Sequence, residues 1–144
     1  MLDVLLHTIK CLLQQTKDID ALLPEVKEKA VLFIGECQKQ GLNIRITDTF
    51  RTPEKQNELY ARGRTIAGPR VTNAKAGQSY HNWGLAFDVC FLGTVPYPPQ
   101  MEQWRRIGRI GEDCGFIWGG SFGDYGHFEY HPTEELSQII RLAK

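Results

Sequence analysis

The chain has 144 residues, of which 42% are hydrophobic and 24% charged. This composition is typical of one globular domain and excludes a disordered, collagen-like or fibrous protein. Its 17 basic and 17 acidic side chains cancel to a formal net charge of zero. A generic nucleic-acid binder is therefore disfavoured, because that class normally carries a basic excess. No stretch approaches the roughly 18 consecutive apolar residues that a membrane-spanning helix needs.

The N-terminus and the cysteines both indicate a protein made in a reducing cytoplasm. Residues 1–7 contain no basic region of the kind that opens a signal peptide, and Lys10 interrupts the apolar run that follows. The four cysteines are far apart and include no C-x-x-C pair. We expect them to be free thiols that pack as small hydrophobic side chains.

Hydrophobic periodicity predicts two helices and a strand in the first third of the chain. Leucine and isoleucine recur at helical spacing over residues 2–15. A second helix is predicted to begin at Pro24, because proline suits a first helical turn, and to end near Gln40, where Gly41 follows. Apolar and polar residues alternate over residues 42–47, several of them β-branched, which predicts a short strand.

The middle of the chain predicts a helix, a long loop and a buried strand. Thr52 is placed as an N-cap before Pro53, and the helix is expected to run to about Arg62. Residues 63–80 are rich in glycine, alanine and small polar side chains, and so predict a loop of a length that is usually functional or disordered. Residues 85–90 predict a buried strand.

Two more helices and a short strand are predicted in the last third. One helix spans residues 101–114, a strand covers 128–130, and Thr133 would cap a final helix. The first of these helices is expected to bury Trp104, Ile107 and Ile110. Because helices and short strands do not alternate as regular βαβ units, the predicted fold class is α+β in a single domain of residues 1–144.

Three residues of the second half form a candidate ligand set for a divalent metal ion, namely His81, Asp88 and His127. Two imidazoles and a carboxylate suit zinc, and three protein ligands leave a fourth position for water. Asp88 follows Ala86 and Phe87 within an apolar stretch, where a metal ion would compensate a costly buried charge. The alternative is that Asp88 pairs with an arginine and His127 is an ordinary strand histidine. Three dispersed ligands leave both interpretations open.

Further polar and aromatic side chains are candidates for the same site. Asp124, three residues before His127, could take a proton from metal-bound water, and Glu129, on the same strand face as His127, could orient it or act as the base instead. Arg51 lies at a strand–helix junction and could clamp a carboxylate or a developing oxyanion. Trp118 precedes paired glycines that suggest a loop tip, and so could wall a groove. For each of them the alternative is a solvated or core side chain.

Charge is uneven along the chain, although the total is zero. Residues 41–80 hold 7 basic and 3 acidic side chains, a net charge of +4. This segment could face an anionic substrate or could be solvated.

Residues 79–88, SYHNWGLAFD, resemble the S-x-H-x-x-G-x-A-x-D motif of the D-alanyl-D-alanine-type zinc peptidases. Asp124-x-x-His127 resembles the second motif of that family. Four further stretches are similar to phage endolysins of the L-alanyl-D-glutamate peptidase type, at residues 50–56, 59–65, 71–75 and 115–120. The resemblance covers about residues 24–144.

The resemblance implies the fold of these peptidases, a small and mostly antiparallel sheet flanked by helices. An N-terminal helix over residues 1–20 would precede a zinc-peptidase core over 24–144, with no separate wall-binding module. The implied activity is hydrolysis of the L-Ala–D-Glu amide in peptidoglycan stem peptides. The alternatives are a D-Ala-D-Ala carboxypeptidase or dipeptidase, and a non-catalytic zinc-stabilised module that binds wall peptide. A non-haem iron oxygenase is a further alternative, but its usual H-x-D spacing is absent.

The positions that match the family imply the role of each site residue. One zinc ion would be held by His81, Asp88 and His127, with Asp124 as the base. Arg51 would steady the polarised carbonyl of the scissile amide. The expected substrate-binding residues are Ser79, Gln56 and Trp118. The basic segment 41–80 fits the acidic D-Glu of such a substrate.

The resemblance also implies a cellular setting. The protein would be a monomer, made in the cytoplasm of a bacterial host without a signal peptide, and would act at the cell wall or in the periplasm after release by a holin-type partner. Its partner molecule would be the peptidoglycan stem peptide, with neither nucleic acid nor stable membrane binding involved.

Overall fold

Short strands and amphipathic helices of this chain assemble around one shared core. The computed structural model describes residues 19–92, 100–132, 134 and 138. The helices of this part are α2 (Pro24–Lys39), α3 (Pro53–Ala61) and α4 (Met101–Asp113), with the 3₁₀ turns η1 (Tyr80–Trp83) and η2 (Gly119–Phe122). The strands are β1 (Ile44–Asp48), β2 (Ala86–Phe91), β3 (Ile117–Trp118) and β4 (His127–Glu129).

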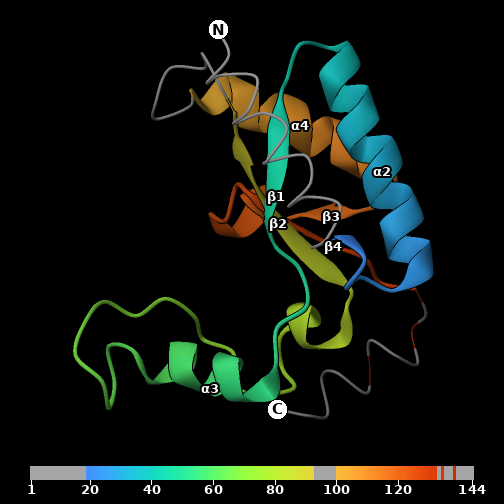
Figure 1. Ribbon diagram of the computed structural model, residues 1–144. Coiled ribbons are helices and arrows are strands. Elements are labelled where there is room, and N and C mark those ends of the chain that lie inside the picture. Colours follow the sequence, from blue (N-terminus) through green and yellow to red (C-terminus); the bar gives the residue numbers. More distant parts are fainter. Residues whose placement is uncertain (1–18, 93–99, 133, 135–137, 139–144) are drawn as a thin grey trace, which may run out of the picture.

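The four strands form one sheet in the order β1-β2-β4-β3, and every neighbouring pair is antiparallel. Helices α2 and α4 lie beside this sheet, whereas α3 and the long loop after it project away from it (Figure 1). The predicted α+β class, with a small antiparallel sheet flanked by helices, is confirmed.

Apolar and polar side chains alternate along β2 and β4, which gives the sheet one face toward the core and one polar face. Phe87 and Phe128 are fully buried and pack with Phe33 of α2, whose ring centroid lies 4.7 Å from that of Phe128. Successive strand residues point to opposite faces, so Asp88 and His127 point away from this core. Asp88 and His127 therefore lie on the face of the sheet opposite α2.

Most of the predicted elements are confirmed within one or two residues. Pro24 does open α2, and the Thr52 hydroxyl accepts a hydrogen bond from the Lys55 backbone N–H at 3.1 Å, which caps α3. Gly41 takes a left-handed φ of 75° directly after α2. Trp104 is only partly buried, because its ring packs edge-on against Phe91 at the margin of the core. The expected helix over 2–15 and nearly all of the one after Thr133 lie outside the described residues.

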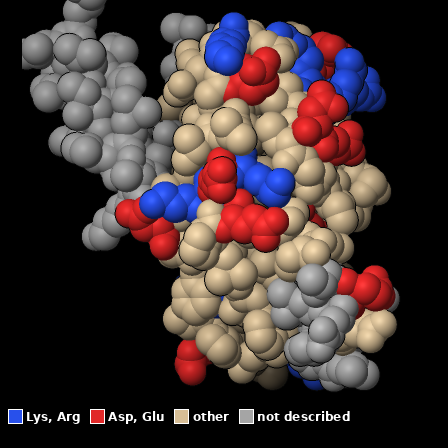
Figure 2. All heavy atoms as spheres, turned by 90° about the vertical axis from the view of Figure 1, so that its right-hand side faces the viewer, with Lys and Arg blue, Asp and Glu red and all other residues tan. Residues whose placement is uncertain are grey.

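The outer face of α2 is exposed and carries charges of both signs, interspersed with uncharged surface (Figure 2). Lys27 pairs with Asp20, and Lys39 lies 3.8 Å from Glu36. Among the helices of the described part, none combines the length and the apolarity that crossing a bilayer requires.

A glycine inside α4 is required by packing. A Cβ atom at Gly111 would lie 2.3 Å from Cε1 of Phe128, an aromatic ring at the centre of the core. Alanine favours a helix over glycine by about 1 kcal/mol, but overpacking a core costs about 1–3 kcal/mol or more. We therefore expect Gly111→Ala to lower the free energy of unfolding by about 1–2 kcal/mol, measured by urea denaturation.

Gly35 of α2 provides the matched control. A Cβ atom there would meet no heavy atom within 4 Å, so only helix propensity should change. Gly35→Ala should raise the free energy of unfolding by about 0.5–1 kcal/mol. Equal stabilisation by both substitutions would contradict the packing of α4 against β4.

Candidate metal centre

Three elements bring the predicted metal ligands together. Asp88 of β2 and His127 of β4 stand directly opposite each other in the antiparallel register. His81 comes from η1, and Gly84 with its left-handed φ of 68° turns the chain from η1 into β2. One ligand atom from each of the three side chains lies within 4.8 Å of the other two.

The distances within this cluster fit a zinc ion. Nδ1 of His127 lies 3.0 Å from Oδ1 of Asp88, and Nε2 of His81 lies 3.3 Å from Oδ2 of the same carboxylate. Zinc bonds of about 2.0–2.2 Å in a tetrahedron separate neighbouring ligand atoms by roughly 3.4 Å. The donor set and its spacing therefore suit one zinc ion with a position left for water.

A backbone carbonyl fixes the orientation of the His81 ring. The ring is 3% exposed, and its Nδ1 lies 2.6 Å from the carbonyl oxygen of Thr49. A carbonyl oxygen only accepts, so Nδ1 carries a hydrogen and donates it to Thr49. Nε2 faces Oδ2 of Asp88, and it is the nitrogen whose lone pair would ligate a metal ion.

A carboxylate fixes the His127 ring from its other side. Oε1 of Glu129 lies 3.5 Å from Nε2 of His127, and Oε2 lies 3.0 Å from Nε2 of His131. Burial alone would raise the pKa of Glu129, but its interactions with the two histidines lower it. The ionised carboxylate only accepts, which places a hydrogen on Nε2 of His127 and leaves Nδ1 facing the cluster.

The metal-free cluster holds charge that a metal ion would replace. Burial opposes charge on His127, yet Asp88 and Glu129 raise its pKa to about 9. Burial likewise opposes charge on Asp88, yet hydrogen bonds with His127 and His81 hold its pKa well below the usual range. A bound metal ion must displace the proton of His127, so binding at neutral pH releases a proton.

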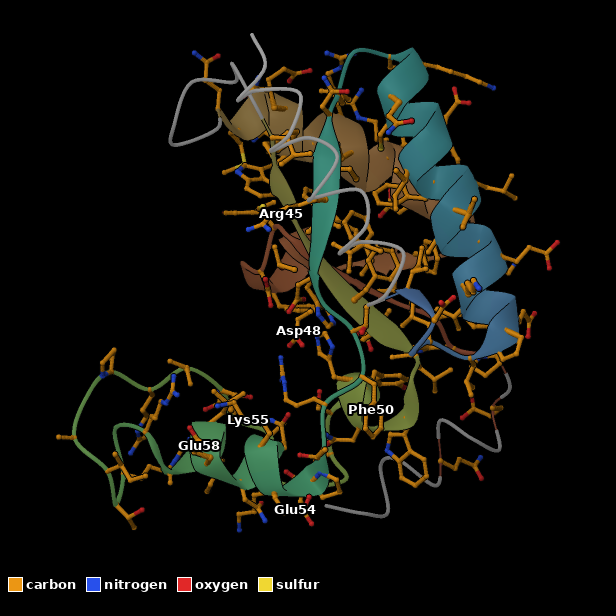
Figure 3. The ribbon with its side chains drawn as sticks, in the orientation of Figure 1. Arg45, Asp48, Phe50, Glu54, Lys55 and Glu58 are labelled. Atoms are coloured by element: carbon orange, nitrogen blue, oxygen red, sulfur yellow. The ribbon has the colours of Figure 1, made fainter. Side chains whose placement is uncertain are left out.

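Arg51 is held at the edge of the cluster by two partners. A β-bulge between Ile46 and Asp48 turns Asp48 to the polar face, opposite Asp88. The Arg51 guanidinium donates to Asp48 and, at 2.9 Å, to Oε1 of Gln56, while its Nη2 lies 3.9 Å from Oδ2 of Asp88. Figure 3 shows Asp48 at the end of β1 that faces α3.

Gln56 supports Arg51 from within the protein. It is fully buried, and its amide donates to the carbonyl oxygen of Ala74 at 2.7 Å. It therefore links α3, Arg51 and the long loop. The structure places it behind the site, and direct contact with substrate stays a prediction.

The cluster lines an open pocket of about 470 Å³. The pocket runs between the sheet and the lobe formed by α3 and the long loop. Its lining includes Arg51, Leu59, Val71, Tyr80, Phe122 and Asp124, besides the cluster itself and Glu129. Asp124 is exposed, yet partial loss of solvent and then the negative charge of Asp88 raise its pKa above the usual value.

Ser79 and Trp118 occupy different positions relative to this pocket. Ser79 lines it, and its hydroxyl accepts a hydrogen bond from the His81 backbone N–H at 3.2 Å, which caps η1. The Trp118 indole donates to the carbonyl oxygen of Tyr125 at 2.8 Å and packs on Gly108 and Gly120. The paired glycines begin η2 in the connection from β3 to β4, where Gly120 makes room for the Trp118 ring. Substrate contact by Trp118 stays a prediction, since this side chain is not among those that line the pocket.

The basic segment does not present its whole charge to the pocket. Of the described lysines and arginines, only Arg51 lines it. Lys55 and Arg62 pair with Glu58 at 3.0 and 3.1 Å, and Arg64 donates to two backbone carbonyls. Much of the excess charge of residues 41–80 therefore stabilises α3 and the long loop.

Three supporting groups were not predicted from the sequence. These are the carbonyl oxygen of Thr49, the carboxylate of Asp48 and the imidazole of His131. Thr49 acts through its backbone and Asp48 through a bulge, and neither leaves a signal in residue type. His131 lies two residues beyond Glu129, a spacing that strand alternation could have flagged.

Known proteins are similar to this chain in sequence and in fold. A family model described as D-alanyl-D-alanine carboxypeptidase matches residues 72–130. The peptidoglycan L-alanyl-D-glutamate endopeptidase CwlK of Bacillus subtilis strain 168 is 36% identical over 123 residues, which cover 76% of this chain and 74% of CwlK.

Two solved structures have the same fold. The D,D-pentapeptidase VanY of a VanB-type resistance cassette, in complex with Zn(II), is 18% identical with a TM-score of 0.60, and the match covers 83% of this chain and 78% of VanY. The L-Ala D-Glu endopeptidase ChiX of Serratia marcescens is 20% identical with a TM-score of 0.57, over 81% of this chain and 86% of ChiX. This chain belongs to the D-alanyl-D-alanine carboxypeptidase family and is a peptidase of peptidoglycan.

Proposed function

We propose that this protein is a zinc-dependent endopeptidase that hydrolyses the L-Ala–D-Glu amide of peptidoglycan stem peptides. The observation that carries the proposal is the convergence of His81, Asp88 and His127 in a pocket that is also lined by an exposed carboxylate, Asp124. The choice of amide is supported by the 36% identity with CwlK, an endopeptidase of that specificity.

The three ligands would hold the metal ion, and Asp124 would move the proton. When bound, zinc would polarise the scissile carbonyl and acidify a water molecule. The Asp124 carboxylate would accept a proton from the attacking water as the oxygen of that water forms a bond to the carbonyl carbon. The same carboxyl group returns the proton to the nitrogen as the C–N bond breaks.

Glu129 is less suited to be the base. It is 9% exposed, and its two oxygens face Nε2 of His127 and Nε2 of His131. A carboxylate in these contacts orients its neighbours and has little freedom to collect a proton from water. We therefore assign the base to Asp124.

Arg51 would stabilise negative charge that develops on the scissile carbonyl oxygen. Its guanidinium lies at the pocket wall and is fixed by Asp48 and Gln56. Because these partners hold the side chain before substrate arrives, little reorganisation is needed during reaction. Ser79, at the same wall, would help to hold the peptide.

A D-Ala-D-Ala carboxypeptidase is the second candidate. The family model that matches residues 72–130 is described by that activity. The two activities release different products, since an L-Ala–D-Glu endopeptidase frees a new amino group on D-Glu and a carboxypeptidase frees D-alanine.

Digestion of purified peptidoglycan, followed by mass spectrometry of the fragments, distinguishes the candidates. We expect fragments that begin with D-Glu, their loss after treatment with a chelator, and their return when Zn²⁺ is added. Release of D-alanine alone would establish the second candidate. Binding to peptidoglycan without any new amino terminus would instead indicate a non-catalytic module.

The cellular setting inferred from the resemblance extends this proposal. An enzyme of this type would reach the wall from the host cytoplasm with the help of a holin-type partner and would act there as a monomer. Co-expression with a holin should cause lysis that expression of the peptidase alone does not.

A further inference from the structure

His131 lies just beyond β4 and joins two of the elements that carry the candidate ligands. Its Nε2 lies 3.0 Å from Oε2 of Glu129 in β4. Its ring stacks on the ring of Tyr80, with centroids 4.3 Å apart and an interplanar angle of 7°. Tyr80 is the residue directly before His81. One imidazole therefore contacts both η1 and β4.

The Glu129 carboxylate is divided between two imidazoles. Oε1 faces Nε2 of His127 at 3.5 Å, and Oε2 faces Nε2 of His131. The shorter contact is a hydrogen bond, in which the imidazole of His131 donates to the carboxylate. The contact with His131 fixes one oxygen and thereby the rotation of the whole group. Without the hydrogen bond from His131, Oε2 of Glu129 would have no partner, and the carboxylate could rotate away from His127.

The Tyr80 ring holds His131 in the plane that this hydrogen bond needs. Parallel aromatic rings at this separation are in van der Waals contact, which limits the rotation of both side chains. The side chain of His131 is 34% exposed, so burial alone does not fix it. The stack and the hydrogen bond together do.

We propose that His131 is a positioning residue of the metal centre, which acts through Glu129 to hold Nδ1 of His127 toward the metal ion. The inference rests on the ligand set of the proposed function. Partners of metal ligands commonly change metal affinity by about 10–100-fold when removed. Because His131 acts one contact further out, we expect a loss of about tenfold, the lower end of that range.

The test measures the zinc affinity of the purified protein by competition with a chromogenic chelator. His131→Ala should weaken zinc binding by about tenfold. His131→Gln, whose amide can donate to Oε2 of Glu129 from a similar position, should restore most of the affinity. His131→Asn, which is too short to reach, should not restore it.

Tyr130→Phe is the matched control. The Tyr130 hydroxyl donates to Glu25 at 2.6 Å and belongs to the residue next to His131. Its removal should leave zinc affinity unchanged. A second comparison uses Glu129→Ala, in which the group through which His131 acts is absent. Adding His131→Ala to that variant should cause no further loss of affinity.

The outcomes separate the two proposals. A wild-type protein that binds no zinc would overturn the proposed function and this inference with it. A wild-type protein that binds zinc no better than His131→Ala would overturn the inference alone. A loss that is equally large in the Glu129→Ala background would also overturn it. If His131→Ala fails to fold, the other two variants decide. Zinc affinity that is kept by His131→Gln and lost by His131→Asn supports the proposal. Zinc affinity equal to that of the wild type in both variants overturns it.

Discussion

Asp124→Asn should bind zinc as tightly as the wild type and hydrolyse peptidoglycan about 10²–10⁴-fold more slowly. Asparagine keeps the size of the side chain but can neither accept the proton of the attacking water nor return it to the leaving amine. Since Asp124 is exposed at the pocket and is not one of the three clustered ligands, the metal centre should stay intact. Steady-state turnover and zinc stoichiometry, measured on the same preparation, check the expected loss of activity and the expected retention of zinc.

Asp113→Asn is the control for this substitution. Asp113 is the last residue of α4, exposed and outside the pocket lining, so the same loss of a carboxylate there should leave turnover unchanged. Normal turnover of Asp124→Asn would assign the base to Glu129 instead. Loss of zinc from Asp124→Asn would show that Asp124 is a ligand.

His81→Ala should lose both zinc and activity. The ring supplies one of three ligand atoms and is itself only 3% exposed, so a solvent molecule would not take its place with the same fixed orientation. Removing a ligand itself should cost more than the roughly 10–100-fold in affinity that removing an outer partner costs. Zinc retained after dialysis, measured by mass spectrometry, gives the result directly.

Two controls accompany the His81→Ala experiment. The unfolding of metal-free His81→Ala and of metal-free wild type should both be cooperative, which excludes a global loss of structure. His7→Ala removes a histidine from outside the predicted ligand set and should leave one zinc ion bound. A His81→Ala protein with full activity and one bound zinc ion would contradict the ligand assignment.

Local signals in the sequence explain why much of the fold could be predicted. Proline in a first turn and threonine as an N-cap act within three or four residues, so α2 and α3 begin at the predicted positions. Alternation along β2 likewise separates Phe87 from Asp88 without any knowledge of the tertiary structure. The β3 strand was missed because two residues carry no measurable periodicity.

The sequence predicted which residues form the candidate site but not how their side chains are arranged in space. Residue type and spacing alone left the ligand set open, and the resemblance of residues 79–88 and 124–127 to the family motifs singled it out. Non-local contacts decided the rest. Gly120 lies in the connection from β3 to β4, and the Trp118 ring that it accommodates could not be predicted from local sequence. The bulge that turns Asp48 toward Arg51 depends on the register of β1 against β2, which no local pattern specifies.

Anomalous X-ray diffraction at the zinc absorption edge tests the central claim most directly. Crystals of the protein purified with zinc should show one strong anomalous peak, about 2.0–2.2 Å from Nε2 of His81, a carboxylate oxygen of Asp88 and Nδ1 of His127. A fully ordered cluster without such a peak, or a zinc ion bound only at other residues, would contradict the account.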